Sequence, residues 1–167
     1  MRLQLSPRRH ANIFLPADPG RKGVAGLPAV RIITSGKVRN RFAAEGIQEY
    51  VKRISPFARI DIVENAGRGR RKAGPAQIKL KEGELAIALD AGGEQVTSED
   101  LSRILAERDR VAFLIGGPEG LPPEALGSSH ARVSLSRMTF TSELAELILV
   151  EQIYRAFMIL NNRPYHK

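Results

Sequence analysis

A glycine-rich segment in the second half of the chain could bring the backbone close to a ligand. Arg110–Ile115 (RVAFLI) is predicted to be a buried strand, and it runs directly into Gly116–Gly120 (GGPEG). Glycine has no Cβ, so the backbone at Gly116 and Gly117 can lie against a bound molecule. Open parallel sheets bind ligands outside the carboxyl ends of their strands, where this segment falls. Taken alone, the pattern is equally typical of an ordinary tight turn.

Motifs that the sequence lacks narrow the class of ligand. There is no G-x-x-x-x-G-K-[ST] phosphate loop, and no G-x-G-x-x-G follows the first predicted strand. The glycine segment also carries no lysine to hold phosphates. We therefore expect a ligand with little or no phosphate, such as an adenosine that carries an amino acid.

The charge of the chain predicts a polyanionic partner. The 167 residues carry a formal net charge of +8, and the basic residues are unevenly placed, which favours nucleic acid over a merely solvated surface. Phosphate contacts supply affinity but little sequence choice. The candidates are Lys37, Arg39, Arg41, Arg68, Arg70, Arg71 and Lys72.

Several classes of protein are excluded or disfavoured by composition. The chain has no cysteine, which excludes disulfides and thiolate catalysis. Its three histidines are scattered, so we expect no metal site. No segment approaches the roughly 20 apolar residues of a membrane span, and no secretory signal is present. We therefore expect a cytoplasmic protein with no membrane contact.

Alternating strands and helices predict the fold class. The predicted strands are Arg31–Ser35, Arg59–Glu64, Leu85–Asp90, Arg110–Ile115 and Arg132–Ser136. Helical spacing follows the first strand up to Pro56, a capping box at Thr97 and Asp100 begins a second helix, and Pro122 and Pro123 suit the start of a third. This order is typical of an α/β domain, mostly a parallel sheet with helices on both faces.

Two segments outside these elements are basic and irregular. The irregular, basic sequence of residues 1–30 predicts a flexible extension. Residues 31–167 are then expected to form the folded domain. Asn65–Lys81 has six basic residues and no acid, and its glycines and its proline predict a mobile loop. A separate turn of the chain is predicted at Ala91–Gly93.

The final helix, from about Ser142, is apolar around nearly its whole circumference. Such a helix must be buried on all sides. In a chain of this size, one side is expected on the sheet and the other on a second copy of the chain. Burial within a single chain is the alternative.

Four motifs together resemble a known family. They are Leu114–Leu121 (LIGGPEGL), Ser134–Phe140 (SLSRMTF), Glu151–Ala156 (EQIYRA) and Pro164–Lys167 (PYHK). In this order and spacing they are similar to the ribosomal RNA large subunit methyltransferase H family. These are SPOUT-class enzymes that methylate N3 of a pseudouridine in 23S ribosomal RNA. The similarity runs from about Arg31 to Lys167.

The resemblance implies properties that the pattern alone does not. It implies a C-terminal trefoil knot, which topology rules would otherwise reject. It also implies a homodimer and S-adenosyl-L-methionine as the cofactor. The family's cofactor positions fall on Leu89, Gly116, Leu135, Ser136, Arg137, Met138, Thr139 and Phe140.

Three residues near the carboxyl terminus are candidates for positioning RNA or transferring a proton. His166 has a suitable unperturbed pKa near 6.5, although it could instead contact phosphate or order the tail. Tyr165 could stack on a base or simply pack. Arg155 lies four residues after Glu151, a spacing typical of an ion pair, and the other interpretation is contact with RNA or with the cofactor-side loop across the dimer.

The sequence departs from the family pattern beside the cofactor motif. Thr141 and Ser142 stand where the family has Pro-His, and Glu146 stands where a basic residue is usual. The segment from Gln77 to Leu85 is also shorter. These departures motivate an alternative, a catalytically silent RNA- or ribosome-binding protein that retains the methyltransferase fold. A small-molecule enzyme unrelated to RNA is a third hypothesis, which the basic segments disfavour.

Overall fold

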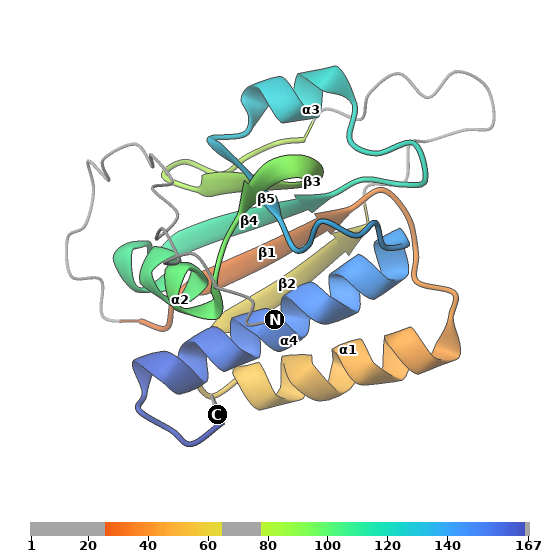
Figure 1. The fold of residues 1–167 in the computed structure, drawn as a ribbon. Helices are drawn as coiled ribbons and strands as arrows, with labels where there is room; N and C mark the ends of the chain where they lie inside the picture. Colours follow the sequence, from red (N-terminus) through yellow and green to blue (C-terminus); the bar gives the residue numbers. More distant parts are fainter. Residues whose placement is uncertain (1–25, 65–77, 166–167) are drawn as a thin grey trace, which may run out of the picture.

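A five-stranded parallel sheet forms the centre of the protein (Figure 1). The computed structural model describes residues 26–64 and 78–165. The strands lie in the order β2-β1-β4-β3-β5, and every pair is parallel. They are β1 (Ala29–Thr34), β2 (Arg59–Glu64), β3 (Leu85–Gln95), β4 (Arg110–Ile115) and β5 (Ala131–Ser134). The predicted α/β class with a parallel sheet is confirmed.

Helices cover both faces of the sheet, as predicted (Figure 1). The first two are α1 (Arg41–Ile54) and α2 (Ser98–Glu107), and they are followed by α3 (Pro123–Ser128) and α4 (Ser142–Leu160). Three of them, α1, α2 and α4, share the main core on one face, whereas the short α3 lies against β3 on the other. Parallel neighbouring strands need a long crossover connection, and helices usually provide it.

The central strands are buried on both faces. Ile32 of β1 and Ile87 of β3 both pair with Phe113 of β4, and these three side chains are at most 1% exposed. Ile33 and Leu114 form a smaller cluster on the opposite face. Near-continuous apolar strands of this kind are expected in a parallel sheet. Each large buried side chain stabilises the fold by about 1.5–3 kcal/mol.

Strand β3 is longer than predicted. The expected turn at Ala91–Gly93 is wrong, because the strand continues to Gln95 after a break in register between Leu89 and Glu94. A Cβ at Gly93 would lie 2.8 Å from the backbone of β5, so glycine permits this close approach. Periodicity could not show the irregularity, because the strand crosses two glycines that are also typical of turns.

The alternating sequence of strand β2, RIDIVE, is typical of a half-buried strand, but the single chain does not bury it. Five of its six residues are exposed, including Ile62 at 36% and Val63 at 40%. The reason is its place at the edge of the sheet, where β1 is its only neighbour among the described strands. The alternating pattern identified the strand but could not identify an edge.

Helix termini follow the local sequence signals. Thr97 caps α2, and its hydroxyl and the Asp100 carboxylate form the predicted capping box. Thr141 caps α4 by accepting a hydrogen bond from the Leu144 backbone N–H at 3.4 Å. A residue that departs from the family pattern therefore starts the last helix efficiently.

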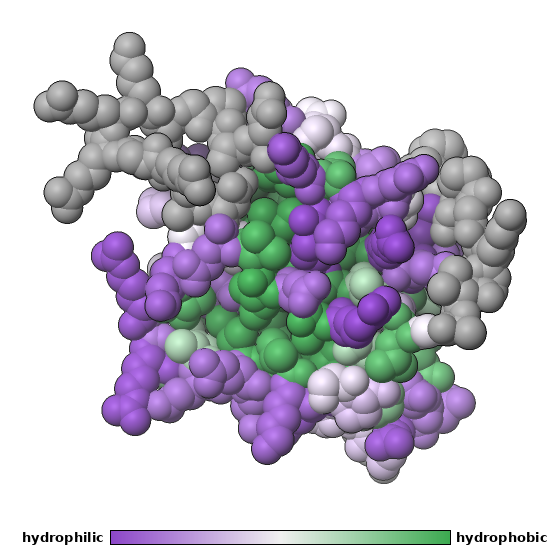
Figure 2. Space-filling view, turned by 180° about the vertical axis from the view of Figure 1, so that it is seen from behind, coloured by the Kyte–Doolittle hydropathy of each residue, from purple (hydrophilic) through white to green (hydrophobic). Residues whose placement is uncertain are grey.

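Helix α4 lies between α1 and α2 on one face of the sheet. Leu149, Val150 and Ile153 are at most 1% exposed, so burial within the single chain accounts for the middle of the helix. Its ends are less covered, since Leu144 and Leu160 are 41% and 39% exposed. Figure 2 shows further apolar surface at the centre of the face seen from behind, with hydrophilic side chains around it.

Some predictions fall outside the part of the chain that the structure describes. These are most of the 1–30 extension, the core of the Asn65–Lys81 loop and His166. The first strand begins at Ala29, two residues earlier than predicted. Within residues 26–64 and 78–165, no helix is long and apolar enough to cross a membrane.

Candidate functional site

A cavity of about 290 Å³ lies at the carboxyl ends of β4 and β5, beside the register break of β3 after Leu89. We call it the glycine cavity, after Gly116 and Gly117 in its wall. Seven of the eight predicted cofactor positions line it: Leu89, Gly116, Leu135, Ser136, Met138, Thr139 and Phe140. The eighth, Arg137, is exposed and is not among the lining residues. The structure thus brings segments separated by about fifty residues of chain around one space.

The glycine segment is a tight turn as well as a cavity wall. The Gly120 N–H donates to the Gly117 carbonyl at 2.9 Å, and Gly120 has a φ of +80°. A Cβ on Gly116 would lie 2.2 Å from the Gly120 carbonyl carbon. No other residue fits at Gly116 without moving the loop. The tight turn is therefore confirmed and also lines a cavity, whereas binding of a ligand at this segment stays a prediction.

Serine side chains hold the segment after β5 in shape. The Ser134 hydroxyl donates to the Ser136 carbonyl at 2.7 Å, and the Ser136 hydroxyl accepts from the Met138 backbone N–H at 3.0 Å. Met138 is 72% exposed and Phe140 40% exposed, so apolar side chains stand at the rim. An apolar rim with few charges suits a neutral aromatic group such as a nucleobase.

A second cavity, of about 360 Å³, adjoins the first. We call it the acidic cavity. Gly117, Pro118 and Ser142 line both cavities. The rest of the wall comes from the segment after β1, with Lys37 and Arg39, and from the first turns of α4, with Glu143 and Glu146.

The two glutamates of the acidic cavity differ in their surroundings. Oε1 of Glu143 accepts from the backbone N–H groups of Arg39 at 2.5 Å and Asn40 at 3.3 Å, which ties α4 to the segment before α1. Glu146 is 4% exposed, and the described chain gives it no hydrogen bond. Burial, followed by the nearby charges of Glu64 and Glu143, raises the pKa of Glu146 to about 7.

Sequence reasoning noted Glu146 only as a departure from a family pattern. A further signal was available, because Glu146 lies at helical spacing with Val150, Ile153 and Phe157, all of them buried. A carboxylate on the apolar face of a helix is a sign of a functional group, since isolated buried charges destabilise a fold.

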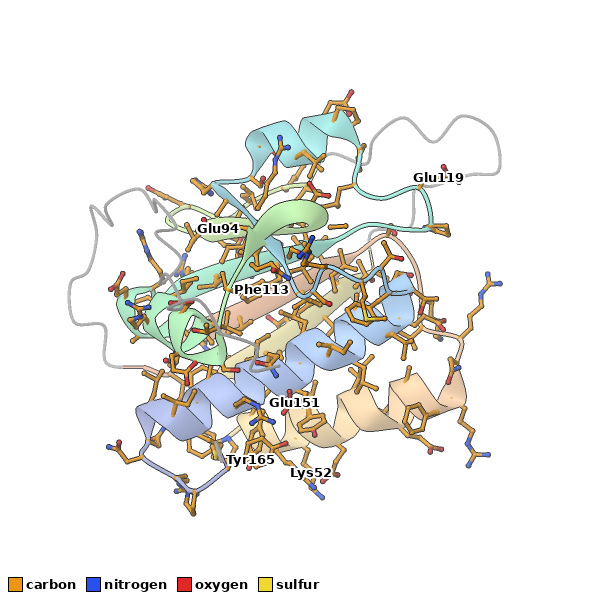
Figure 3. All side chains as sticks on the ribbon, viewed as in Figure 1. Lys52, Glu94, Phe113, Glu119, Glu151 and Tyr165 are labelled. Atoms are coloured by element: carbon orange, nitrogen blue, oxygen red, sulfur yellow. The ribbon has the colours of Figure 1, made fainter. Side chains whose placement is uncertain are left out.

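Arg155 and Tyr165 lie near the other end of α4, away from both cavities. The Arg155 guanidinium is 2.7 Å from the Glu151 carboxylate, so the ion pair is formed. Tyr165 donates to the same carboxylate at 3.2 Å, and Figure 3 shows the two side chains close together. Burial and the hydrogen bond with Tyr50 raise the pKa of the Tyr165 hydroxyl above its usual value. Within one chain, these two candidates do not meet the cofactor positions.

Comparison with known proteins identifies the family. A family model described as "Predicted SPOUT methyltransferase" matches residues 29–166. The chain belongs to the SPOUT methyltransferase family. The match begins at the first residue of β1 and spans both cavities.

Relatives of this SPOUT methyltransferase carry consistent names. The chain is 42% identical over 159 residues to "Ribosomal RNA large subunit methyltransferase H" of Symbiobacterium thermophilum, with 83% of this chain and 99% of that protein covered. It is 38% identical over 157 residues to the protein of the same name from Carboxydothermus hydrogenoformans, with the same coverage. A relative from Methanocorpusculum labreanum, named as putative, is 38% identical over 156 residues.

A solved structure shares the fold of this SPOUT methyltransferase. A probable methylase family protein from Haemophilus influenzae superposes with a TM-score of 0.51 at 13% identity. The superposition covers 83% of this chain and 70% of that one. It supports the architecture and carries nothing about the site. Within the described ranges, no group of three or more His, Cys, Asp or Glu residues could hold a metal ion.

Proposed function

We propose that this SPOUT methyltransferase transfers a methyl group from S-adenosyl-L-methionine to N3 of a pseudouridine in 23S ribosomal RNA. The observation that carries the proposal is the glycine cavity, around which seven of the eight cofactor positions meet. The names of the relatives support ribosomal RNA as the substrate. The net charge of +8 supports a polyanionic substrate.

The residues at the glycine cavity fit the proposed cofactor. Gly116 leaves a cradle that a Cβ would fill, and Leu89 and Leu135 supply apolar contacts for an adenine ring. When bound, the cofactor supplies a methyl group on a positively charged sulfur. The chain's own contribution is to hold donor and acceptor in line. Such placement is worth about 7–11 kcal/mol of the barrier in well-oriented pairs.

We also propose that the enzyme acts as a homodimer in the cytoplasm. Exposed apolar side chains at the ends of α4 and on the edge strand β2 support a partner surface. The separation of Arg155 and Tyr165 from the glycine cavity supports the same proposal. In a dimer, the carboxyl-terminal segment of one chain, with His166, could reach the cavity of the other and position RNA. Sedimentation equilibrium of the purified protein tests the stoichiometry, and a monomer at micromolar concentration would contradict the dimer.

The alternative function, a silent RNA- or ribosome-binding protein, is motivated by Ser142 and Glu146. Under this alternative, the double change Ser142→His and Glu146→Arg restores the family pattern and creates activity. Under the proposed function, the wild-type chain is already active and the double change does not increase its rate.

The test uses 23S ribosomal RNA and ribosomal subunits that lack the methyl group. The protein is incubated with methyl-labelled S-adenosyl-L-methionine, and the labelled nucleotide is identified by nuclease digestion and mass spectrometry. Label on N3 of a pseudouridine supports the proposal. Binding of RNA without any transfer supports the silent alternative. Transfer to a free nucleoside that is insensitive to salt supports the small-molecule hypothesis.

A further inference from the structure

We propose that Glu146 is a catalytic residue, which accepts the imide proton of the target base in the acidic cavity beside the bound methyl donor. The inference rests on the proposed function and adds the group that makes the base nucleophilic. Neither the resemblance nor the names of the relatives give Glu146 a role.

The acidic cavity adjoins the glycine cavity. It shares Gly117, Pro118 and Ser142 with the glycine cavity, so a molecule in one lies directly beside a molecule in the other. Its volume of about 360 Å³ is at the lower end of the range for small-molecule sites, which suits one nucleoside. Lys37 and Arg39 in its wall provide positive charge for the adjoining phosphates.

The Glu146 carboxylate has no hydrogen-bond partner in the described structure. The residue is only 4% exposed, yet it lines the acidic cavity. Glu143 lines the same cavity, but its Oε1 accepts from two backbone N–H groups. Asp90, in the wall of the glycine cavity, accepts from the Gly92 N–H at 3.3 Å through Oδ1. Of the three carboxylates that line the two cavities, Glu146 is therefore the one with both oxygens open to an N–H group of a ligand.

The charges around Glu146 suit a general base at neutral pH. Glu64 of β2 and Glu143 of α4 bring negative charge near Glu146, and Lys37 and Arg39 bring positive charge to the wall of the same cavity. With burial, the two glutamates raise the pKa of Glu146 to about 7. A general base is most effective when its pKa is near the working pH.

The proposed step begins with proton transfer. The N–H proton moves to a Glu146 oxygen, and the electron pair of that bond remains on the base nitrogen. The nitrogen then bonds to the methyl carbon as the carbon–sulfur bond breaks and its electrons return to sulfur. The products are a methylated base and a neutral thioether, and Glu146 later releases its proton to water.

The experiment measures single-turnover methyl transfer to the unmethylated RNA from pH 5.5 to 9. Wild type should show a rate that rises with pH and levels off above about pH 7. Glu146→Gln, which cannot accept the proton, should lower the plateau of the rate by about 10²–10⁴-fold and remove the rise of the rate with pH. Calorimetric titration with S-adenosyl-L-methionine should remain close to wild type. Glu45→Gln, a change at an exposed position of α1, is the matched control and should behave as wild type.

A second variant keeps the test decisive if Glu146→Gln fails to fold. Glu64→Gln removes one of the charges that raise the pKa of Glu146, so the rise of the rate should occur at lower pH while the plateau of the rate is unchanged. The role of Glu146 would be overturned if the pH at which the rate rises did not move in Glu64→Gln, or if Glu146→Gln were fully active. It would also be overturned if Asp90→Asn, and not Glu146→Gln, lost the rise of the rate with pH. Wild type that binds the donor but methylates no RNA would overturn the proposed function itself, and with it this inference.

Discussion

The Tyr165 hydroxyl lies 3.2 Å from Oε1 of Glu151, and this contact ties the carboxyl-terminal segment back onto α4. The same carboxylate oxygen receives Arg155 at 2.7 Å, whose guanidinium lies 4.9 Å from the centre of the Tyr165 ring. Tyr50 of α1 joins the cluster through a hydroxyl contact of 3.2 Å with Tyr165. Tyr165 is therefore held by residues of two helices, α1 and α4.

Removing the Tyr165 hydroxyl should loosen this attachment. Tyr165→Phe keeps the ring, which packs edge-on against Tyr154 with centroids 4.8 Å apart, but loses both hydroxyl contacts. We expect the free energy of unfolding to fall by about 1 kcal/mol, measured by urea denaturation. Tyr50→Phe, which leaves the Glu151 bond intact, is the matched control and should cost less. Equal losses in the two variants would mean that the bond to Glu151 does not anchor the segment.

The glycine cavity predicts a sharp difference between two glycine-to-alanine changes. Gly116→Ala places a methyl group 2.2 Å from the Gly120 carbonyl carbon, so the loop must shift and binding of S-adenosyl-L-methionine should weaken at least tenfold. Gly127→Ala, in α3, meets nothing within 4 Å and should bind as wild type. Isothermal calorimetry measures both affinities. Unchanged binding by Gly116→Ala would place the cofactor elsewhere.

The buried carboxyl of Glu146 should make stability depend on pH. Its folded pKa is about 7, raised from the ordinary value of 4.5, so the folded state holds the proton more tightly than the unfolded chain does. Folding is then increasingly disfavoured as pH rises from about 4.5 to 7, by about 3 kcal/mol in total. Glu146→Gln should recover this stability at pH 8 and little of it at pH 5.

Denaturation of the two proteins at both pH values measures the effect. Glu45→Gln, at an exposed side chain that pairs with Arg41, should change stability little at either pH. An equal effect of Glu146→Gln at pH 5 and pH 8 would show that the carboxyl is not desolvated in the folded state.

Salt dependence should identify the residues that contact phosphate. If Lys37 at the acidic cavity contacts one RNA phosphate, Lys37→Ala should reduce the slope of log affinity against log salt by about 0.7–0.9. Arg110→Ala is a suitable control, because Arg110 begins β4 at the amino ends of the strands, opposite the cavities, and its side chain donates to the Glu82 carbonyl. A slope that falls equally in both variants would mean that RNA does not bind preferentially at the carboxyl ends of the strands.

The sequence by itself determined which elements form and roughly where. Apolar runs such as Arg110–Ile115 and the capping box at Thr97 depend on neighbours within a few residues, so local patterns are enough to predict them. Motif resemblance also named cofactor positions in segments that the fold brings around one cavity, and their binding of the cofactor stays a prediction. The length of β3 was not predictable, because the fit of Gly93 against β5 depends on a strand about forty residues away.

Only the tertiary structure decided what these residues face. The order β2-β1-β4-β3-β5 makes β2 an edge and leaves Val63 exposed, and no local pattern contains that order. The same arrangement brings the segment after β1 against the start of α4, roughly a hundred residues apart, and encloses Glu146 between them. Burial and like charges then shift the proton affinity of Glu146. Both depend on distances through space that the spacing of residues along the chain does not contain.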